Sequence, residues 1–357
     1  MNGANTTERT QSAAVSSCKN PDCIRCRRYR YVQERARSKL SWILRDLRTR
    51  DESSFSKLNR RIPNAIIPPE TMSSIDNSRS GGGNNNQALC FQNPTVLMVQ
   101  DLPSKEIVTD WHQNVVVYLK KRQARAIVFE ALDKIENNSR IKRDGEDDSN
   151  WTVNDTSPQG HWKVFHILNQ GVWNPMLLSE NENGKETYLD LLDLIHNIPG
   201  LLNNCLFGNV FVSKIYPGTD IEPHCGPTNI RHRLQFLLKL PGKSSPVTHS
   251  SVVEPKNNDV LDGETEPALS LSVGRIEKIT WNADNDAFVF DDSFIHSVTY
   301  RNDDSAKEKL ETENFSHEDD FARVVLIVDL WHPNLQESEK MILQHSYPPF
   351  TIDTCKQ

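Results

Sequence analysis

The sequence predicts a mainly β chain, an antiparallel barrel or jelly roll with flanking helices, and three observations support this. From Trp151 onward, short runs of β-branched and aromatic residues alternate with Gly, Pro, Asn and Asp, as strands alternate with turns. Before Trp151, apolar residues recur at helical spacing. Hydrophobic residues make up only 36% of the chain, and the 15 glycines do not raise the share to the roughly 45–50% usual in globular domains. We therefore expect a partly disordered N-terminal region.

Residues 1–50 are expected to form a basic, cysteine-containing head with an amphipathic helix. They hold 12 Lys and Arg against 4 Asp and Glu, although the whole chain has a net charge of −7. Apolar residues recur every three or four positions, with arginines between them, at Tyr29, Val32, Ala36, Leu40, Ile43 and Leu47. Such a helix is either solvated or makes peripheral contact with an anionic membrane. The acidic remainder argues against a direct nucleic-acid role.

Three cysteines cluster in this head, in the segment CKNPDCIRC. Cys18, Cys23 and Cys26 include one CxxC spacing, which is common among metal ligands, but no fourth Cys or His follows nearby. Three states stay open: reduced thiols, a zinc knuckle completed from elsewhere in the chain, or a disulfide.

The rest of the chain divides by composition. Residues 51–93 include SGGGNNNQ and are expected to be a flexible linker. A helix is expected over Gln113–Ile135, and residues 302–320 are expected to be an acidic surface insertion. No apolar run is long enough to cross a membrane and no signal peptide is evident, so the sequence predicts a soluble, cytoplasmic protein. The expected strands are WKVFHIL, NVFVSKIY, RLQFLLKL, ALSLSV, AFVFDD and RVVLIVDLW.

Two strand-like stretches concentrate polar residues that a purely structural core would exclude. In the first, His224 is followed by Arg231, Arg233 and Gln235, which alternate and therefore share one face of a strand. The second ends FDDSFIH at His296.

An arginine, Arg323, also opens the apolar run VVLIVDLW, where burial is costly without an anionic partner. Two histidines from different strands, together with inward arginines, predict a metal ion and a cosubstrate that carries carboxylates. Two nearby acids, Glu222 and Asp286, are expected to be solvated loop carboxylates.

These blocks resemble a known family. PGTDIEPHCGPTNIRHR, FDDSFIH and RVVLIVDLWHPNL look like the signature blocks of the aspartyl/asparaginyl β-hydroxylases, and GHWKVFHILNQG resembles their upstream block. The aspartate β-hydroxylase domain-containing proteins are nearer still, since they also carry a short CxxxxCxxC segment before the catalytic domain. The resemblance implies a hydroxylase-like domain over residues 94–345, with a double-stranded β-helix (jelly-roll) oxygenase core over residues 151–335.

For the metal, the resemblance implies Fe(II) held by His224 and His296. Most related oxygenases add a carboxylate ligand, but members of this family place Gly there, as Gly226 stands here. Asp291 or Asp292 is expected to support the metal through water. The implied cosubstrates are 2-oxoglutarate and O₂, and the implied reaction hydroxylates a carbon of an Asp or Asn side chain in a protein or peptide.

For the anions, the resemblance implies that Arg323 and the hydroxyl of Ser213 bind the distal carboxylate of 2-oxoglutarate. Arg233 and Arg231 are expected to bind the acidic substrate side chain or the other cosubstrate carboxylate, and Arg233 is also counted with the catalytic residues. Gln235 stands where the founding hydroxylases have a His that contacts the cosubstrate, and an amide cannot become cationic.

Two other functions stay open. The Gln at this position favours a non-catalytic binding or scaffold descendant of the family. Alternatively, the basic cysteine-bearing head is the working part and the barrel is incidental. Because relatives are commonly membrane-anchored, membrane association is the alternative to a soluble location.

Overall fold

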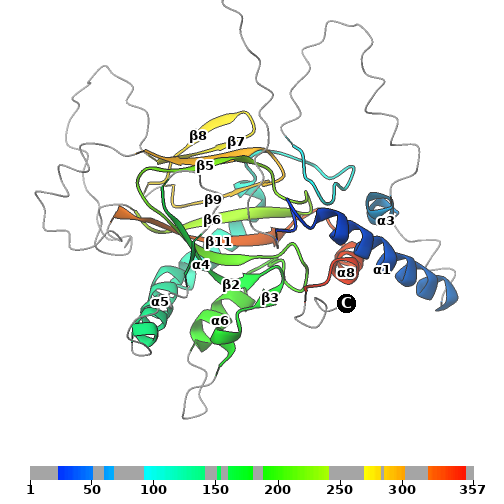
Figure 1. The fold of residues 1–357 in the computed structure, drawn as a ribbon, viewed down its shortest axis with the longest axis horizontal. Helices are drawn as coiled ribbons and strands as arrows, with labels where there is room; N and C mark the ends of the chain where they lie inside the picture. The colour runs from blue at the N-terminus through cyan, green and yellow to red at the C-terminus, as the bar shows by residue number, and fades with distance from the viewer. Residues whose placement is uncertain are drawn as a thin grey trace, which may run out of the picture.

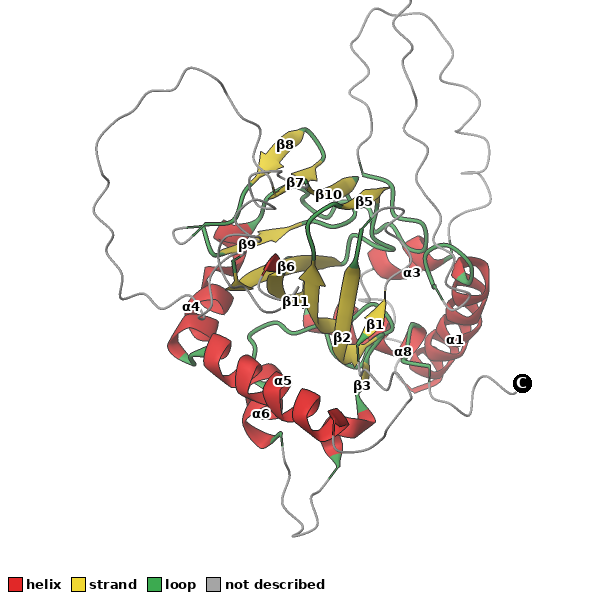
Figure 2. Ribbon diagram, turned by 60° about the vertical axis from the view of Figure 1, so that its left-hand side comes forward, coloured by secondary structure: helices red, strands yellow, loops and turns green. Residues whose placement is uncertain are grey.

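The computed structural model describes residues 23–50, 60–67, 92–140, 151–153, 160–179, 188–240, 269–282, 285–301 and 321–350. Cys18, the expected acidic insertion at residues 302–320 and most of the expected linker lie outside them. Within the described residues the chain is mainly β, with two antiparallel sheets and helices around them (Figures 1 and 2).

The larger sheet has seven strands in the order β1-β2-β4-β11-β6-β9, with β3 paired to β2. Its long central strands are three of the runs expected from their alternating apolar residues. In β11 all nine residues are buried, as befits a strand covered on both faces. The strands are β1 (Thr152–Val153), β2 (Trp162–Asn169), β3 (Val172–Trp173), β4 (Val210–Ile215), β6 (Arg231–Lys239), β9 (Ala287–Phe290) and β11 (Arg323–Trp331).

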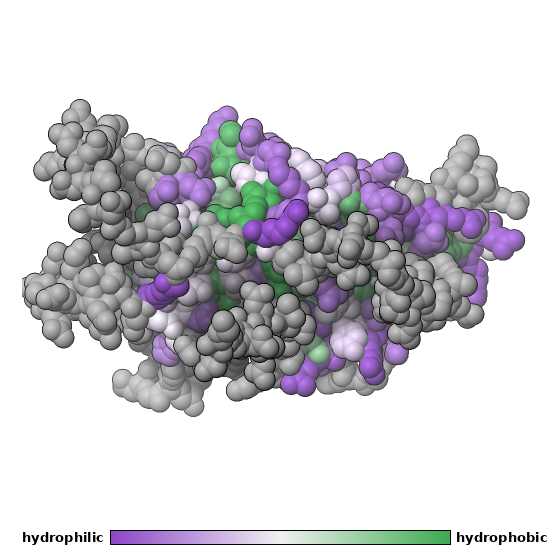
Figure 3. Space-filling model, turned by 90° about the horizontal axis from the view of Figure 1, so that it is seen from above, coloured by the Kyte–Doolittle hydropathy of each residue, from purple (hydrophilic) through white to green (hydrophobic). Residues whose placement is uncertain are grey.

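The smaller sheet has four strands in the order β5-β10-β7-β8 and lies over one face of the larger sheet (Figure 1). An apolar cluster joins the two sheets, because it includes Phe211, Leu237 and Val325 from the larger sheet and Leu271 and Val298 from the smaller. Seen from above the smaller sheet, the described surface is largely hydrophilic around a small apolar area (Figure 3). The strands are β5 (Thr219–His224), β7 (Leu269–Val273), β8 (Ile276–Ile279) and β10 (His296–Tyr300).

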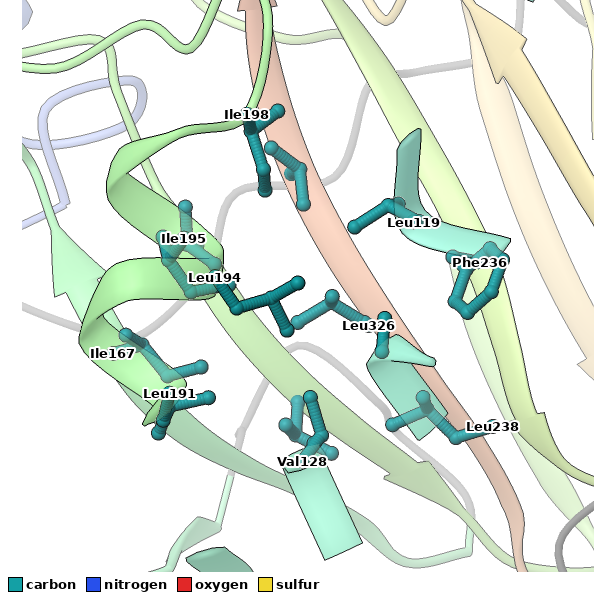
Figure 4. Packing of buried hydrophobic residues seen from close by; sticks show 14 of the residues in the cluster. Leu119, Val128, Ile167, Leu191, Leu194, Ile195, Ile198, Phe236, Leu238 and Leu326 are labelled. Carbon is teal, nitrogen blue, oxygen red and sulfur yellow. The ribbon is translucent and has the colours of Figure 1, made fainter. Parts of the chain in front are cut away.

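Helices cover the other face of the larger sheet. Their apolar side chains and the alternate residues of β2, β6 and β11 form one buried cluster, in which Val128, Leu194, Phe236 and Leu326 meet (Figure 4). The covering elements are η2 (Thr109–His112), α4 (Gln113–Lys121), α5 (Ala124–Arg140), η3 (Pro175–Leu178) and α6 (Leu189–His196).

The expected single helix over Gln113–Ile135 is in fact two helices. The chain turns at Gln123, whose φ of 54° lies in the left-handed region and cannot continue a helix. Arg122, next to the turn, pairs with Asp193 of α6 at 2.5 Å. Tertiary contacts therefore break a pattern that local spacing alone would extend.

The N-terminal helix packs into the domain and is not a detached head. Helix α1 (Tyr29–Arg50) buries Val32, Ala36 and Leu40, as its spacing predicts. These side chains share a hydrophobic cluster with residues of the loop after β11 and of α8 (Glu337–Ser346). Trp42, which lies outside this buried stripe of α1, is 66% exposed. None of the described helices combines the length and the apolar character that a membrane span requires.

A short helix also lies inside the stretch expected to be a flexible linker, so that expectation is wrong for its residues. Helix α3 (Arg61–Ile66) buries Ile62 and Ile66 against the same cluster. Its Arg61 pairs with the buried Glu339 of α8 at 2.5 Å. The helix is too short for periodicity to reveal it, and its contacts with α8 stabilise it.

Candidate functional site

Two histidines meet across neighbouring strands of the smaller sheet. His224 ends β5, His296 begins β10, and the antiparallel register pairs them directly, with ring centroids 4.2 Å apart. The Nδ1 of each ring bonds a backbone carbonyl two residues earlier, that of Glu222 at 2.8 Å and that of Phe294 at 2.9 Å. A carbonyl only accepts hydrogen bonds, so Nδ1 carries the proton and Nε2 carries the lone pair in both neutral rings.

This pair fits a divalent metal ion held through two protein ligands. Burial lowers the pKa of His224 well below its ordinary value and lowers the pKa of His296 to about 4, so both rings are neutral at pH 7. A neutral ring with a fixed tautomer is what metal ligation requires. No group of three or more His, Cys, Asp or Glu side chains in the described part of the chain could hold a metal ion. The described site therefore offers two ligands and no triad.

The space that a third ligand would need holds a different carboxylate. A Cβ added to Gly226 would lie 2.6 Å from the carboxylate atoms of Asp292, closer than side chains pack. The Gly226 amide also donates to the Asp292 carbonyl at 2.5 Å. The charge of Asp292 acts on the neighbouring His296 and favours its protonated form, against the larger effect of burial. Of the two expected aspartates, Asp292 is thus the one whose charge acts on the histidine pair.

Asp291 faces elsewhere, although the sequence leaves the two aspartates equivalent. Its carboxylate accepts hydrogen bonds from the Ser293 amide at 3.0 Å and from Gln92 Nε2 at 3.2 Å. Burial raises its pKa to about 7, and these contacts fix the turn that precedes β10. We assign Asp291 to holding that turn.

Two arginines of β6 are neutralised by two buried aspartates. Arg231 donates to Asp292 through Nε at 3.2 Å and Nη2 at 2.5 Å, and to Asp329 through Nη1 at 2.8 Å. Arg233 donates to both oxygens of Asp329, at 2.8 and 3.1 Å, and its Nη1 lies 3.4 Å from Asp292. Asp329 and Asp292 are fully buried, so the four side chains form a charge-balanced cluster beside the histidines.

This cluster separates the expected roles of Arg231 and Arg233. Arg231 is 3% exposed, and a further bond joins its Nη1 to the carbonyl of Phe207 at 2.5 Å. With its donors occupied inside the protein, Arg231 has the contacts of a supporting residue, not of a substrate-binding one. Arg233 is only partly buried and remains open to a ligand.

Arg323 has no acidic partner among the described residues, which sets it apart from the β6 arginines. It is 1% exposed at the start of β11. Its Nη1 donates to Gln235 Oε1 at 3.3 Å, its guanidinium lies 4.4 Å from the centre of the Trp281 ring, and its Nε is buried with no hydrogen-bond partner in the structure. Burial lowers the pKa of Arg323 to about 9. A buried cation with an unused donor is the signature of a site for an anion.

Ser213 and Gln235 lie on the strands that flank Arg323. β11 pairs with β4, which carries Ser213, and with β6, which carries Gln235. The Ser213 hydroxyl accepts a hydrogen bond from the Trp162 indole at 3.0 Å, which leaves its own hydrogen to donate. Gln235 orients the guanidinium by accepting from it. The predicted cosubstrate residues are therefore brought together on the inner face of the larger sheet.

Sequence reasoning missed two residues of this region. Asp329 is buried within an apolar strand, and an acid in such a run signals a buried partner. Arg25 lies in the segment before α1, where its Nη1 donates to the carbonyl of Cys225 at 3.3 Å. No sequence signal connects two residues 200 positions apart.

Comparison with known proteins points to one family. The model of the family described as aspartyl/asparaginyl beta-hydroxylase matches residues 121–333. Among curated proteins, aspartate beta-hydroxylase domain-containing protein 2 of Xenopus tropicalis is 30% identical over 72% of this chain. The human protein of that name is 27% identical over 93% of this chain. The human aspartyl/asparaginyl beta-hydroxylase is 25% identical over 52% of this chain.

The matched lengths differ between these relatives. The chain spans 56% of the Xenopus relative, 70% of the human protein of the same name and 18% of the human aspartyl/asparaginyl beta-hydroxylase. A solved structure of Cellulomonas parahominis L-ribose isomerase aligns with 48% of this chain, and this chain covers 61% of that one. The identity is 12% and the TM-score is 0.21, too low to indicate a shared fold.

Proposed function

The chain belongs to the aspartyl/asparaginyl β-hydroxylase family, and on that premise we propose that it is an Fe(II)- and 2-oxoglutarate-dependent dioxygenase. Its substrate is an Asp or Asn side chain of a protein or peptide, and its core is a double-stranded β-helix. Two facing antiparallel sheets with the histidines on one and the arginines on the other support this core. When bound, Fe(II) supplies the activation of O₂ that couples decarboxylation of 2-oxoglutarate to hydroxylation.

The single observation that carries this proposal is the buried guanidinium of Arg323, which has no acidic partner among the described residues. A protein that used this position only for structure would place an acid beside it, as Asp286 lies 2.6 Å from the buried Arg125. Arg323 instead meets the amide of Gln235 and the ring of Trp281. The Arg323 guanidinium is planar, charged and buried, which suits it to bind one carboxylate group of a dicarboxylate through two hydrogen bonds.

The other residues then take defined roles. Arg323 and Ser213 bind the distal carboxylate of 2-oxoglutarate, and Gln235 holds the guanidinium in place. His224 and His296 hold the metal through Nε2, with their Nδ1 protons fixed on backbone carbonyls. Arg233, held by Asp329, faces the reacting groups as a fixed cation. A Gln in place of the family's His at position 235 is compatible with these roles, because Gln235 does not bind the cosubstrate directly but accepts a hydrogen bond from Arg323.

Calorimetry of 2-oxoglutarate binding to the Mn(II)-loaded full chain tests the proposal. We expect saturable, metal-dependent binding to the wild-type protein, weakened at least a hundredfold in Arg323→Met, since a buried bidentate ion pair is lost. Arg275→Met is the matched control, because Arg275 is 71% exposed on the β7–β8 hairpin and pairs with Glu106 at 3.1 Å, not with a residue of the predicted carboxylate site. Folded wild-type protein that fails to bind millimolar 2-oxoglutarate would favour a non-catalytic scaffold.

A further inference from the structure

The segment before α1 lies against the strand that carries the first metal ligand. Arg25 Nη1 donates to the carbonyl of Cys225, the residue directly after His224, at 3.3 Å. The Arg25 carbonyl in turn accepts from the Thr95 hydroxyl at 3.2 Å, and Gln33 of α1 donates to the Val96 carbonyl at 3.0 Å. These contacts fix the N-terminal segment at one end of the sheets, where α1 begins (Figure 1).

Arg25 is a cation beside the metal ligands that no described acid neutralises. Burial is the main cause of the lowered pKa of His224 and His296, and the charge of Arg25 lowers both further, so Arg25 lies within electrostatic reach of the two rings. Arg231 and Arg233 are already balanced by Asp292 and Asp329. The charge of Arg25 is therefore available to bind an anionic group of a ligand.

A cleft of about 420 Å³ begins at the same segment. Its lining connects to the site through His166, whose ring centroid lies 5.3 Å from that of Phe211, and the Arg233 guanidinium lies 5.8 Å from the same Phe211 ring. The cleft is thus bounded by the N-terminal segment on one side and by the β2–β3 turn on the other. Its walls include Arg28, His166, Gln170, Trp173, Asn174 and Phe350.

We propose that Arg25 binds the acidic side chain of the substrate, and that the substrate chain lies in this cleft. The inference rests on the proposed function and sharpens it, because a cation at this position selects an Asp side chain over Asn. The N-terminal segment then completes the active site with a substrate-binding residue that the sheets themselves do not supply.

The substrate carboxylate and the cosubstrate carboxylate take separate positions. Arg323 contacts Gln235, whereas Arg25 contacts the residue after His224. Gln235 and Arg233 are two residues apart on β6, about 7 Å along an extended strand. An anion at Arg323 and an anion at Arg25 therefore meet different parts of the chain and can be bound together.

Ligand-observed NMR on the full Mn(II)-loaded chain tests this inference. The probes are pools of blocked pentapeptides with random flanks and a central Asp, Asn or Ala, with and without 2-oxoglutarate. The wild-type protein should broaden the resonances of the Asp pool most. Arg25→Gln should weaken binding of the Asp pool about tenfold and remove the preference over Asn, since one charge-assisted contact is lost. Arg25→Lys should keep part of the preference.

Arg27→Gln is the matched control, because Arg27 lies in the same segment and is exposed. Its thermal midpoint and that of Arg25→Gln should equal the wild-type value. Calorimetry with 2-oxoglutarate on the same variants separates the two proposals: Arg25→Gln should bind the cosubstrate as the wild type does. Equal binding of the Asp and Asn pools by wild-type protein overturns the inference, and so does a loss of cosubstrate affinity in Arg25→Gln. Failure of wild-type protein to bind 2-oxoglutarate counts against the proposed function instead.

Discussion

Replacing Arg323 by Met should make the ligand-free protein more stable, although most substitutions of buried residues do the opposite. Arg323 is 1% exposed, and no described acid lies beside it. Burial lowers its pKa from 12.5 to about 9, which corresponds to about 5 kcal/mol against the charged form. Because pH 7 lies below both values, the guanidinium is charged in the folded and unfolded chains and the whole cost is present.

Met keeps most of the aliphatic stem and removes the charge. The substitution loses the contact with the Trp281 ring, worth about 1–2 kcal/mol, and the hydrogen bond to Gln235, worth about 1 kcal/mol. The net expectation is a free energy of unfolding about 2–3 kcal/mol higher in Arg323→Met. Arg231→Met should instead lose about 3–5 kcal/mol, because it leaves Asp292 and Asp329 buried with one cation fewer.

Urea denaturation followed by circular dichroism, with and without Mn(II) and 2-oxoglutarate, measures both variants. In the Mn(II)-loaded proteins, 2-oxoglutarate at about 100 times the wild-type Kd should stabilise the wild type by about 2.7 kcal/mol and Arg323→Met by at most about 0.4 kcal/mol. The stability advantage of Arg323→Met should therefore shrink by about 2 kcal/mol or more on addition of 2-oxoglutarate. A loss of stability in Arg323→Met as large as that in Arg231→Met would refute the reasoning, since it would make the guanidinium a structural group.

Two further predictions follow from the same geometry. Gly226→Asp adds a carboxylate at the position of the third ligand in related oxygenases. It should lower the free energy of unfolding by about 2 kcal/mol or more, because its Cβ would lie 2.6 Å from the Asp292 carboxylate. Calorimetry should show no tighter Mn(II) binding, and tighter binding in a stable variant would contradict this. His112 is buried against His232, and burial lowers its pKa from 6.5 to about 4. The unfolded chain therefore binds more protons between these values, and stability should fall by about 2 kcal/mol from this residue as pH drops from 7.5 to 5. His112→Gln should reduce that fall in urea denaturation at the two pH values, and an unchanged pH dependence would exclude the effect.

Strand alternation made much of this site predictable. Arg233 and Gln235 share a face because side chains alternate along β6, and that face turned out to be the inner one. The cost of a buried Arg323 was also evident from the apolar run that follows it. The family resemblance covered these blocks, and the family model confirms it.

What escaped prediction depends on contacts between distant residues. Asp286, expected to be a solvated carboxylate, is 2% exposed because Arg125 and Lys120 of the covering helices reach it at 2.6 and 2.8 Å. Arg231 was expected to touch the substrate, and only the pairing of β6 with β11 brings Asp329 beside it. Local sequence gives no information about which distant acid neutralises a buried cation.

The four arginines around the site show why this distinction matters for function. All four are cations of the candidate site, and residue type alone does not separate their roles. Arg231 and Arg233 pair with Asp292 and Asp329, so their charges are balanced within the protein. Arg323 and Arg25 meet only neutral groups among the described residues. Leaving a cation without a counter-ion costs stability, so its retention is explained by an anion that arrives with the reaction. Two such cations at separate positions match the two carboxylate-bearing reactants that the proposed reaction requires, 2-oxoglutarate and an Asp side chain.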